Sequence, residues 1–408
     1  MVMSDRPHAA KPQAMDLHPR GALGSCVKAN TLGVMGGGQL GRMWVHAAQA
    51  MGFTTVVLEP DAGSPAGAVS HVHLRAAYDD AQALRMLANT CLAVSTEFEN
   101  VPAPSLDTLA QGCFVAPGAH AVRICQDRAL EKAHFVSQGV PCAPHASIST
   151  AADLLVVDAS LFPAILKTAQ MGYDGRGQVL VADASVLPSA WRSLGGVRCL
   201  LEKQLSLTFE VSVIVARGWD GAMVHLPVQQ NLHRQGILAV TQVPAPDLRL
   251  VLADQAVQCA QQLAAGMGYV GVLCVEFFVL DDGSLVANEM APRPHNSGHY
   301  SLDACDQSQF ALQLRAMARL PLVAPRLHSA AVMLNLLGEL WPLQTDGQRA
   351  APDWAPLLAL PGVHLHLYGK HEARAGRKMG HLTVTAATPQ AARATALQAA
   401  ALLGMAPF

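Results

Sequence analysis

Two apolar runs on either side of an Asp-Gly pair constrain the fold of this chain more than any other feature. The segment 271–289 reads as an apolar run, then Asp282-Gly283, then a second apolar run. This pattern predicts a β-hairpin with a two-residue loop. In that register Glu276 pairs with Glu289, and their Cβ atoms lie about 4.5–5.5 Å apart on one face.

Two opposed carboxylates repel each other unless a cation lies between them. Oxygen ligands at this separation suit Mg²⁺, whose shell is commonly completed by nucleotide phosphates. The alternative is a solvated carboxylate pair on the surface of a sheet. Val275, Phe277 and Phe278 make the strand apolar on both faces, which favours the metal site.

Composition excludes several classes of protein. A chain of 408 residues is long enough for two or three domains. A net charge of −2 argues against a nucleic-acid or membrane surface, and no apolar run approaches the length of a membrane span. Residues 1–30 lack the apolar region of a signal peptide. We therefore expect them to form a disordered extension. Nine cysteines without a Cys-x-x-Cys motif indicate reduced thiols in the cytoplasm.

The N-terminal part alternates strands and helices. Strands are expected at 31–35, 54–58 and 91–95, with a helix at 42–51 and another at 123–138 that leads out of the unit. Such alternation is typical of a parallel α/β domain.

A glycine pattern follows the first expected strand. Gly36 to Gly41 matches Gly-x-Gly-x-x-Gly, and Glu59 lies where a ribose-binding acid would be in an NAD site. The pattern itself establishes only a tight turn with exposed amides at a helix N-terminus, which binds any phosphate or none.

The central part carries a second group of signals. The expected strand 163–167 ends in a lysine, and the three glycines of Gly172–Gln178 predict a mobile loop whose amides can close over phosphates. An ordinary surface loop is the alternative. Further strands are expected at 199–203 and 209–216.

Five segments, in this order, resemble the ATP-grasp superfamily and, within it, the 5-(carboxyamino)imidazole ribonucleotide synthetases, which are ATP-dependent carboxylases of purine biosynthesis. The segments are 36–43, 97–101, 172–178, 288–299 and 368–381.

The resemblance spans residues 31 to about 385. Three features depart from it: residues 1–30 have no counterpart, Thr96 replaces an aromatic residue, and Arg176 replaces a lysine.

The resemblance implies an α/β ATP-grasp fold with an N-terminal parallel, Rossmann-like pre-ATP-grasp domain and a small C-terminal domain. After the extension 1–30, the expected domains are 31–127, 128–325 and 326–408. A mobile lid is expected at about 160–208.

The resemblance also implies a nucleotide site. Arg128 and Lys167 would hold ATP phosphates, Glu202 would accept the adenine amino proton, and Glu210 would bind the ribose. His233 would lie near the nucleotide, although a lone histidine is as often structural. The implied ATP-binding residues are Arg128, Lys167, Gly172, Tyr173, Asp174, Gly175, Arg176, Gly177, Gln178, Glu202, Lys203, Gln204, Leu205, Glu210, His233, Asn288 and Glu289. Glu276 and Glu289 would ligate Mg²⁺, with two ions expected.

The remaining implied residues bind the other substrates. Arg293, His295 and Asn296 would form the bicarbonate and carboxyphosphate site, although a structural turn is the alternative reading of this loop. With Asp174 they are the expected catalytic residues. The expected residues for aminoimidazole ribonucleotide are Gln39, Glu97, Asn100, Tyr173, Ser297, Lys370 and Arg377. A solvated basic face is the alternative for Lys370 and Arg377.

The implied reaction carboxylates aminoimidazole ribonucleotide through carboxyphosphate, without biotin or NAD. Asp174 and His295 are both candidates to accept the amine proton. A cytoplasmic homodimer is expected. Three alternatives stay open: a formate-dependent glycinamide ribonucleotide transformylase, an NAD-dependent dehydrogenase, and a non-catalytic nucleotide-binding module.

Overall fold

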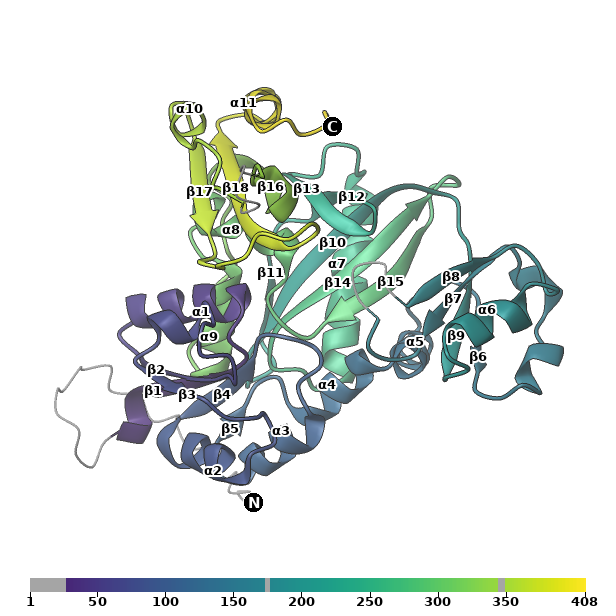
Figure 1. The fold of residues 1–408 in the computed structure, drawn as a ribbon, viewed down its shortest axis with the longest axis horizontal. Coiled ribbons are helices and arrows are strands. Elements are labelled where there is room, and N and C mark those ends of the chain that lie inside the picture. The colour runs from purple at the N-terminus through teal and green to yellow at the C-terminus, as the bar shows by residue number, and fades with distance from the viewer. Residues whose placement is uncertain (1–26, 173–176, 344–348) are drawn as a thin grey trace, which may run out of the picture.

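The computed structural model describes residues 27–172, 177–343 and 349–408, and three β-sheets organise them (Figure 1). Residues 1–26 of the expected extension lie outside these ranges. Residues 27–30, which belonged to the predicted disordered segment, form a short 3-10 helix instead. Two side-chain hydrogen bonds hold this turn: Lys28 donates to the Gly112 carbonyl at 2.7 Å and Asn30 to the Gly52 carbonyl at 2.8 Å.

The N-terminal sheet is parallel, which confirms the predicted α/β character of this part of the chain. Its strand order is β3 (Val72–Leu74), β2 (Thr54–Leu58), β1 (Thr31–Met35), β4 (Ala93–Thr96) and β5 (Phe114–Val115). Its helices are α1 (Gln39–Ala50), α2 (Ala81–Thr90), α3 (Ala103–Ala110) and α4 (Ala119–Gln126).

The central sheet has nine strands and extends into the C-terminal part of the chain. Its order is β15 (Leu285–Ala291), β14 (Gly271–Leu280), β10 (Leu207–Arg217), β12 (Gln229–Arg234), β13 (Ile237–Val243), β16 (Ala330–Leu337), β18 (Lys378–Ala386) and β17 (Val363–Leu367), with β11 (Met223–His225) paired to β10. Because β13 pairs with β16, the sheet crosses the expected domain boundary at residue 326.

Helices cover this central sheet. They are α7 (Leu250–Gly266), α8 (Ser301–Ala304), α9 (Gln309–Met317), α10 (Ala355–Leu358) and α11 (Pro389–Leu402). Helix α9 buries Phe310, Leu314 and Met317 in one cluster with Trp44 of α1 and Leu32 of β1. The N-terminal and central sheets are therefore joined through a shared core.

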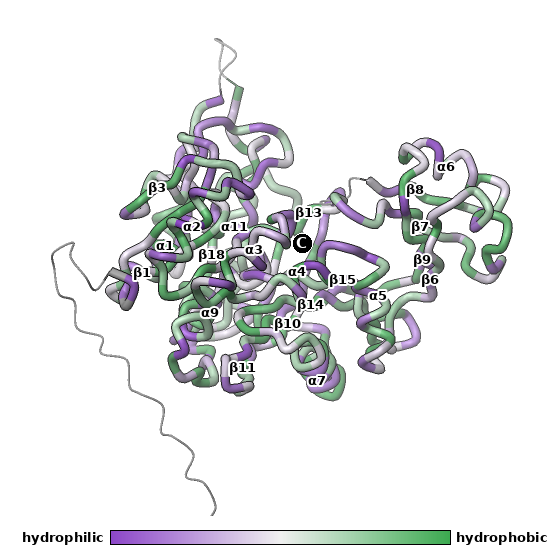
Figure 2. The backbone as a smooth tube through the Cα atoms, turned by 90° about the horizontal axis from the view of Figure 1, so that it is seen from below, coloured by the Kyte–Doolittle hydropathy of each residue, from purple (hydrophilic) through white to green (hydrophobic). Residues whose placement is uncertain are grey.

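A third sheet stands apart from the other two at one side of the molecule (Figures 1 and 2). It contains β6 (His145–Ile148), β9 (Cys199–Lys203), β7 (Ala164–Thr168) and β8 (Gln178–Val181), in that order, with α6 (Leu187–Ser193) packed on it. One connection to the central sheet runs through 138–144, where the Pro141 carbonyl accepts from Ala287 N at 2.7 Å. None of the helices in the described ranges is both long and apolar enough to cross a membrane.

The hairpin differs from its predicted form in its loop and in one strand, and the two differences have opposite effects on the strand register. Val279 pairs with Leu285 and Phe277 with Ala287, so the loop has three residues, 281–283, with Gly283 at φ +79°. The strand β15 then carries one extra residue, Asn288, in a β-bulge. The bulge restores the register, and Glu276 pairs with Glu289 as predicted.

The predicted helix 123–138 was wrong, because it is two helices. Asp127 is extended, with φ −129° and ψ 110°, and it separates α4 from α5 (Arg128–Ser137). Its Oδ1 accepts from Ala129 N at 3.0 Å and Leu130 N at 3.2 Å, which caps α5. Its Oδ2 accepts from Gln170 at 3.1 Å and also pairs with Arg198 of the third sheet.

We expect Asp127→Ala to destabilise the protein more than Asp80→Ala. Asp80 caps α2 in the same way, with bonds from Gln82 N at 2.9 Å and Ala83 N at 2.8 Å, but it is exposed. Loss of a cap costs about 1 kcal/mol. Asp127→Ala should cost about 2–3 kcal/mol, because hydrogen bonds of a buried carboxylate are lost too.

The free energy of unfolding from urea denaturation measures both values. Equal losses in the two variants would show that the contacts of Asp127 with Gln170 and Arg198 contribute nothing.

Candidate active site

A cavity of about 620 Å³ lies between the central sheet and the third sheet. Many of the expected site residues line it, although they are scattered over more than 180 positions of the sequence. Those in its wall are Asn100, Arg128, Lys167, Gly172, Gln178, Glu210, His233, Glu276, Asn288, Glu289, Arg293, His295 and Asn296. Tyr173, Asp174, Gly175 and Arg176 lie outside the described residues.

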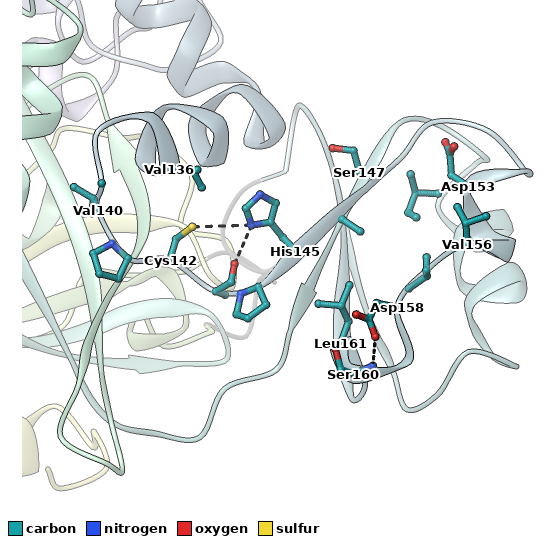
Figure 3. A pocket seen from close by; sticks show the side chains of 17 residues that line it. Val136, Val140, Cys142, His145, Ser147, Asp153, Val156, Asp158, Ser160 and Leu161 are labelled. Carbon is teal, nitrogen blue, oxygen red and sulfur yellow. Dashed lines mark hydrogen bonds between the residues drawn. The ribbon is translucent and has the colours of Figure 1, made fainter.

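A second hollow, of about 760 Å³, lies where the chain passes from α5 into β6 (Figure 3). Its lining is largely apolar, and its polar groups mostly bond to the backbone nearby. His145 Nδ1 is 2.9 Å from the Ala143 carbonyl, and Asp158 accepts from Ser160 N at 2.8 Å. Since no cation lines it, this larger hollow lacks the charges that phosphate chemistry requires, and the 620 Å³ cavity is the better candidate.

Glu276 and Glu289 occupy the floor of the cavity. Burial and the nearby charge of Glu289 raise the pKa of Glu276 to about 7. Burial alone would also raise the pKa of Glu289, but the charges of Arg128 and Lys167 outweigh it and lower that pKa. Arg128 Nη1 lies 3.3 Å from Glu289 Oε2. Two opposed carboxylates on adjacent strands, the buried Glu276 and the partly exposed Glu289, form an all-oxygen donor set that fits Mg²⁺.

Lys132 is a site residue that the sequence prediction did not include. Its side chain is only 2% exposed, and its Nζ lies 2.8 Å from Glu202 Oε1 and 2.6 Å from the carbonyl of the bulged Asn288. Lys167 pairs with the other oxygen of Glu202. The two lysines outweigh the effect of burial and lower the pKa of Glu202 to about 2. The scarcity of lysine, with seven in the chain against 21 arginines, is a signal that could have identified Lys132.

Other expected adenine contacts lie where the third sheet meets the central sheet. The carboxylate of Glu202 is occupied by two lysines, and the Lys203 and Gln204 amides donate to the Pro144 and Pro163 carbonyls at 2.8 and 2.9 Å. In this arrangement the expected acceptor role of Glu202 requires one lysine to move.

Glu210 and His233 face each other across β10 and β12. His233 Nδ1 lies 2.5 Å from Glu210 Oε2. Burial would lower the pKa of His233, but the hydrogen bond to Glu210 and the charge of Glu276 raise it. His233 thus lies beside the expected nucleotide site.

The loop after β15 brings polar groups to the same cavity. Asn296 is only 6% exposed, and neither end of its amide has a hydrogen-bond partner within the described part of the chain. Buried amides without partners are rare and indicate a missing ligand or water. Arg293 pairs with Glu99, a carboxylate that was not predicted although it lies inside the 97–101 motif. A small oxyanion would accept a hydrogen bond from Asn296 Nδ2, and a hydroxyl group such as that of bicarbonate would satisfy Oδ1.

Ser297 was expected to bind substrate, but the structure places it elsewhere. Its side chain is fully buried beneath the loop, and its hydroxyl lies 2.9 Å from both Ser212 Oγ and His295 Nδ1. The hydroxyl therefore supports His295 and does not face the cavity.

The glycine turn of the N-terminal domain is occupied by carboxylates of the chain itself. Gly37 N donates to Glu59 Oε2 at 2.7 Å, and Tyr78 donates to the same oxygen at 2.6 Å. Glu97 accepts from Gly41 N at 2.7 Å and also from Gly38 N. Burial raises the pKa of Glu97. A dinucleotide phosphate would have to displace these carboxylates, which argues against the NAD interpretation.

The expected phosphate ligands of the C-terminal part lie in the connection between β17 and β18. Lys370 Nζ donates to the Lys378 carbonyl at 2.7 Å, and Arg377 Nη1 donates to the Glu372 carbonyl at 2.9 Å. Burial, followed by the charge of Arg377, lowers the pKa of Lys370 to about 8. Gln39 begins α1, across from this connection in Figure 1.

A second cluster, Asp303, His366 and His381, lies outside the cavity. His366 Nε2 is 2.9 Å from Asp303 Oδ2, and the rings of His366 and His381 stack 4.4 Å apart at 9°. An ion bound by both histidines must lie in both ring planes. Since the planes are nearly parallel, this arrangement does not form a metal site.

We expect Lys132→Met to lower the free energy of unfolding by about 3–5 kcal/mol, because it leaves a buried carboxylate with one partner instead of two. Lys203→Met is the matched control, since that lysine is half-buried and outside the cavity. Urea denaturation measures both. A loss below 1 kcal/mol in Lys132→Met would contradict the proposed burial of the pair.

Comparison with known proteins supports the family assignment. A model described as the ribonucleotide synthetase preATP-grasp domain matches residues 29–126, and the ATP-grasp domain matches 133–310. The phosphoribosylaminoimidazole carboxylase C-terminal domain matches 331–395.

Individual relatives match nearly their whole length. An N5-carboxyaminoimidazole ribonucleotide synthase of Brucella melitensis is 42% identical over 87% of this chain and 96% of its own. The solved structure of a Staphylococcus aureus N5-carboxyaminoimidazole synthetase with ADP has a TM-score of 0.81 and 36% identity over 92% of this chain and 97% of its own. An Aspergillus clavatus synthase solved with ADP and 5-aminoimidazole ribonucleotide has a TM-score of 0.82 and 32% identity, with coverage of 92% and 98%. The chain therefore belongs to the N5-carboxyaminoimidazole ribonucleotide synthase family of ATP-grasp ligases.

Proposed function

We propose that this chain carboxylates 5-aminoimidazole ribonucleotide with ATP and bicarbonate, releasing ADP and phosphate, in the synthesis of purine nucleotides. The observation that carries the proposal is one cavity that holds an opposed carboxylate pair, Glu276 and Glu289, beside the Asn296 amide, which has no partner among the described residues. The ligands of the similar solved structures, ADP and 5-aminoimidazole ribonucleotide, support it.

The nucleotide half of the cavity lies between the third sheet and β15. Lys167 and Arg128 supply positive charge on either side of Glu289, where the β- and γ-phosphates would lie. Glu276 and Glu289 would hold magnesium, with two ions as the resemblance implies. When bound, the metal supplies the charge that stabilises the transferring phosphoryl group.

The reaction begins with attack of a bicarbonate oxygen on the γ-phosphorus. The bond from that phosphorus to ADP breaks, and carboxyphosphate forms. Arg293, His295 and Asn296 would orient the anion through guanidinium, imidazole and amide hydrogen bonds. The exocyclic amine of the ribonucleotide then bonds to the carboxyl carbon, either directly or after CO₂ release. Phosphate leaves, and the amine gives up a proton to form a carbamate.

The ribonucleotide would lie between the N-terminal domain and the connection 368–378. Lys370 and Arg377 would bind its phosphate, and Gln39, Glu97 and Asn100 would contact its base. Carboxyphosphate hydrolyses readily, so the site must exclude water. Closure of the third sheet over the cavity, as expected for a lid at about 160–208, would do so.

We also propose a cytoplasmic homodimer that needs neither biotin nor NAD. Support comes from the typical dimeric state of the family that the sequence resembles. The masses of the particles in solution, measured by light scattering after size exclusion, test the dimer.

The proposed reaction is tested by measuring ADP release with Mg-ATP and bicarbonate. We expect strong stimulation by aminoimidazole ribonucleotide, and a loss of at least about 100-fold in Glu289→Gln, because a neutral amide replaces a carboxylate that would hold the magnesium. Asp220→Asn is the control, since Asp220 is exposed and only holds a turn, with Ala222 N at 3.1 Å. Turnover without bicarbonate, or stimulation only by glycinamide ribonucleotide with formate, would keep the fold and overturn the substrate.

A further prediction concerns the pH dependence of the KM for aminoimidazole ribonucleotide. Because the pKa of Lys370 is about 8, the lysine is charged below that pH and loses its charge above it. One unit above its pKa it is about 90% neutral, so the KM for aminoimidazole ribonucleotide should rise about tenfold between pH 7 and 9. In Lys370→Arg the charge persists, and this rise should disappear. An equal rise in both proteins would assign the effect to another group.

A further inference from the structure

A chain of buried polar side chains runs from the central sheet to His295. Asn231 Nδ2 lies 2.7 Å from Ser212 Oγ, which lies 2.9 Å from Ser297 Oγ, and Ser297 Oγ lies 2.9 Å from His295 Nδ1. Ser212 and Ser297 are fully buried. Solvent therefore does not compete for these hydrogen bonds, and each hydroxyl group can donate to few acceptors.

The backbone determines which nitrogen of His295 carries the proton. The amide N–H of Ser297 donates to His295 Nδ1 at 3.3 Å. A backbone N–H can only donate, so Nδ1 must offer a lone pair to it. The proton of the neutral ring is then on Nε2, which lies 3.3 Å from Glu276 Oε1 at the edge of the cavity.

The side-chain hydrogen bonds also indicate that His295 Nδ1 is an acceptor. The amide oxygen of Asn231 accepts from the Thr241 hydroxyl at 3.0 Å, which turns its nitrogen toward Ser212. Ser212 Oγ thus accepts a hydrogen bond from Asn231 and can donate one to Ser297 Oγ. Ser297 in turn can donate to His295 Nδ1. Every donor in this chain meets an acceptor, so the chain supports a single tautomer.

Within the described ranges, Gln229 is the other acceptor near the Ser297 hydroxyl, besides His295. With its amide turned so that the nitrogen donates to the Ser212 and Pro227 carbonyls at 3.1 and 2.7 Å, its oxygen lies 3.3 Å from Ser297 Oγ. The contact of Ser297 with His295 is shorter, at 2.9 Å. Even a hydroxyl turned toward Gln229 would leave the Ser297 backbone bond to Nδ1 in place.

We propose that Ser212, Ser297 and Asn231 are positioning residues that hold His295 in its Nε2–H tautomer, so that His295 donates a hydrogen bond to the reacting anion and does not accept the amine proton. This inference rests on the proposed function and narrows its mechanism. In this tautomer Nε2 has no free lone pair. A proton can enter the ring only at Nδ1, where it would break the bonds to Ser297. The amine proton therefore leaves by another route, to the departing phosphate or to a different side chain.

The tautomer can be observed without turnover. Long-range ¹H–¹⁵N correlation spectra of the full chain labelled with ¹⁵N-histidine distinguish the two neutral tautomers, and the signals that vanish in His295→Gln identify His295. We expect a protonated Nε2 in the wild-type protein and a mixture of tautomers in Ser212→Ala. Ser212→Thr keeps the hydroxyl and should restore the wild-type pattern. A protonated Nδ1 in the wild type, or an unchanged pattern in Ser212→Ala, would overturn the proposal even if the carboxylase assay succeeds.

Kinetics test the role of the donor. Glutamine carries a side-chain N–H but no basic nitrogen, so His295→Gln should retain kcat within about tenfold, whereas His295→Ala should lose about 100-fold or more. Equal losses in both variants would indicate that His295 acts as a base. Ser212→Ala should lower kcat several-fold with an unchanged KM for ATP. An unchanged kcat would count against the proposal.

The matched control is Thr383→Val. It removes a fully buried hydroxyl that has no hydrogen-bond partner in the described part of the protein and that lies away from His295. We expect neither the spectra of His295 nor kcat to change. A change in the control as large as that in Ser212→Ala would show that the loss of any buried hydroxyl has this effect, and would overturn the assignment to the chain through Ser212.

Discussion

The repulsion between Glu276 and Glu289 is the constraint on which the rest of the site depends. Two opposed carboxylates on paired strands, one of them buried, are unfavourable without compensating charge. Helix α5 supplies part of that charge through Arg128, which pairs with Glu289. The break at Asp127 starts the helix at Arg128. The Asp127 cap therefore sets the position of Arg128, and Arg128 compensates the charge of Glu289. In a single continuous helix, Arg128 would lie a turn or more after the first residue and would not be at the helix start.

Buried polar groups beneath the site have two different tasks. Lys132 connects the carboxylate of Glu202 in the third sheet to the backbone of Asn288 in the central sheet, so it joins the two sheets. The serine chain lies on the other side of the hairpin and determines the orientation of one imidazole. The first task concerns charge, whereas the second concerns the position of a proton. In both cases the groups are buried, and burial strengthens each hydrogen bond.

Local patterns in the sequence predicted the parallel N-terminal sheet and the pairing of Glu276 with Glu289, and the resemblance to the family pointed to many of the residues that line the cavity. The pairing was reached through a wrong loop length, since a three-residue loop and a bulge at Asn288 offset each other. The partner of Lys132 and the burial of Ser297 could not be predicted, because Glu202 and Ser212 are far away in the sequence. The break at Asp127 has a local cause, since its side chain caps α5 through Ala129 N and Leu130 N, and the expectation of one helix overlooked that cap.

The shared core around α9 has a consequence for the order of motions. Phe310 and Leu314 pack with residues of α1 and β1, so we expect the N-terminal and central sheets to move together. Of the three sheets in the described ranges, the third has a separate core and is attached through backbone segments near 138–144 and 203–206. Asn100, Lys370 and the anion-binding loop 293–296 would therefore be in place before any substrate binds, whereas the contacts from the third sheet would form on closure. Much of the entropy of ordering would then be lost in the step that closes the third sheet over the bound substrates.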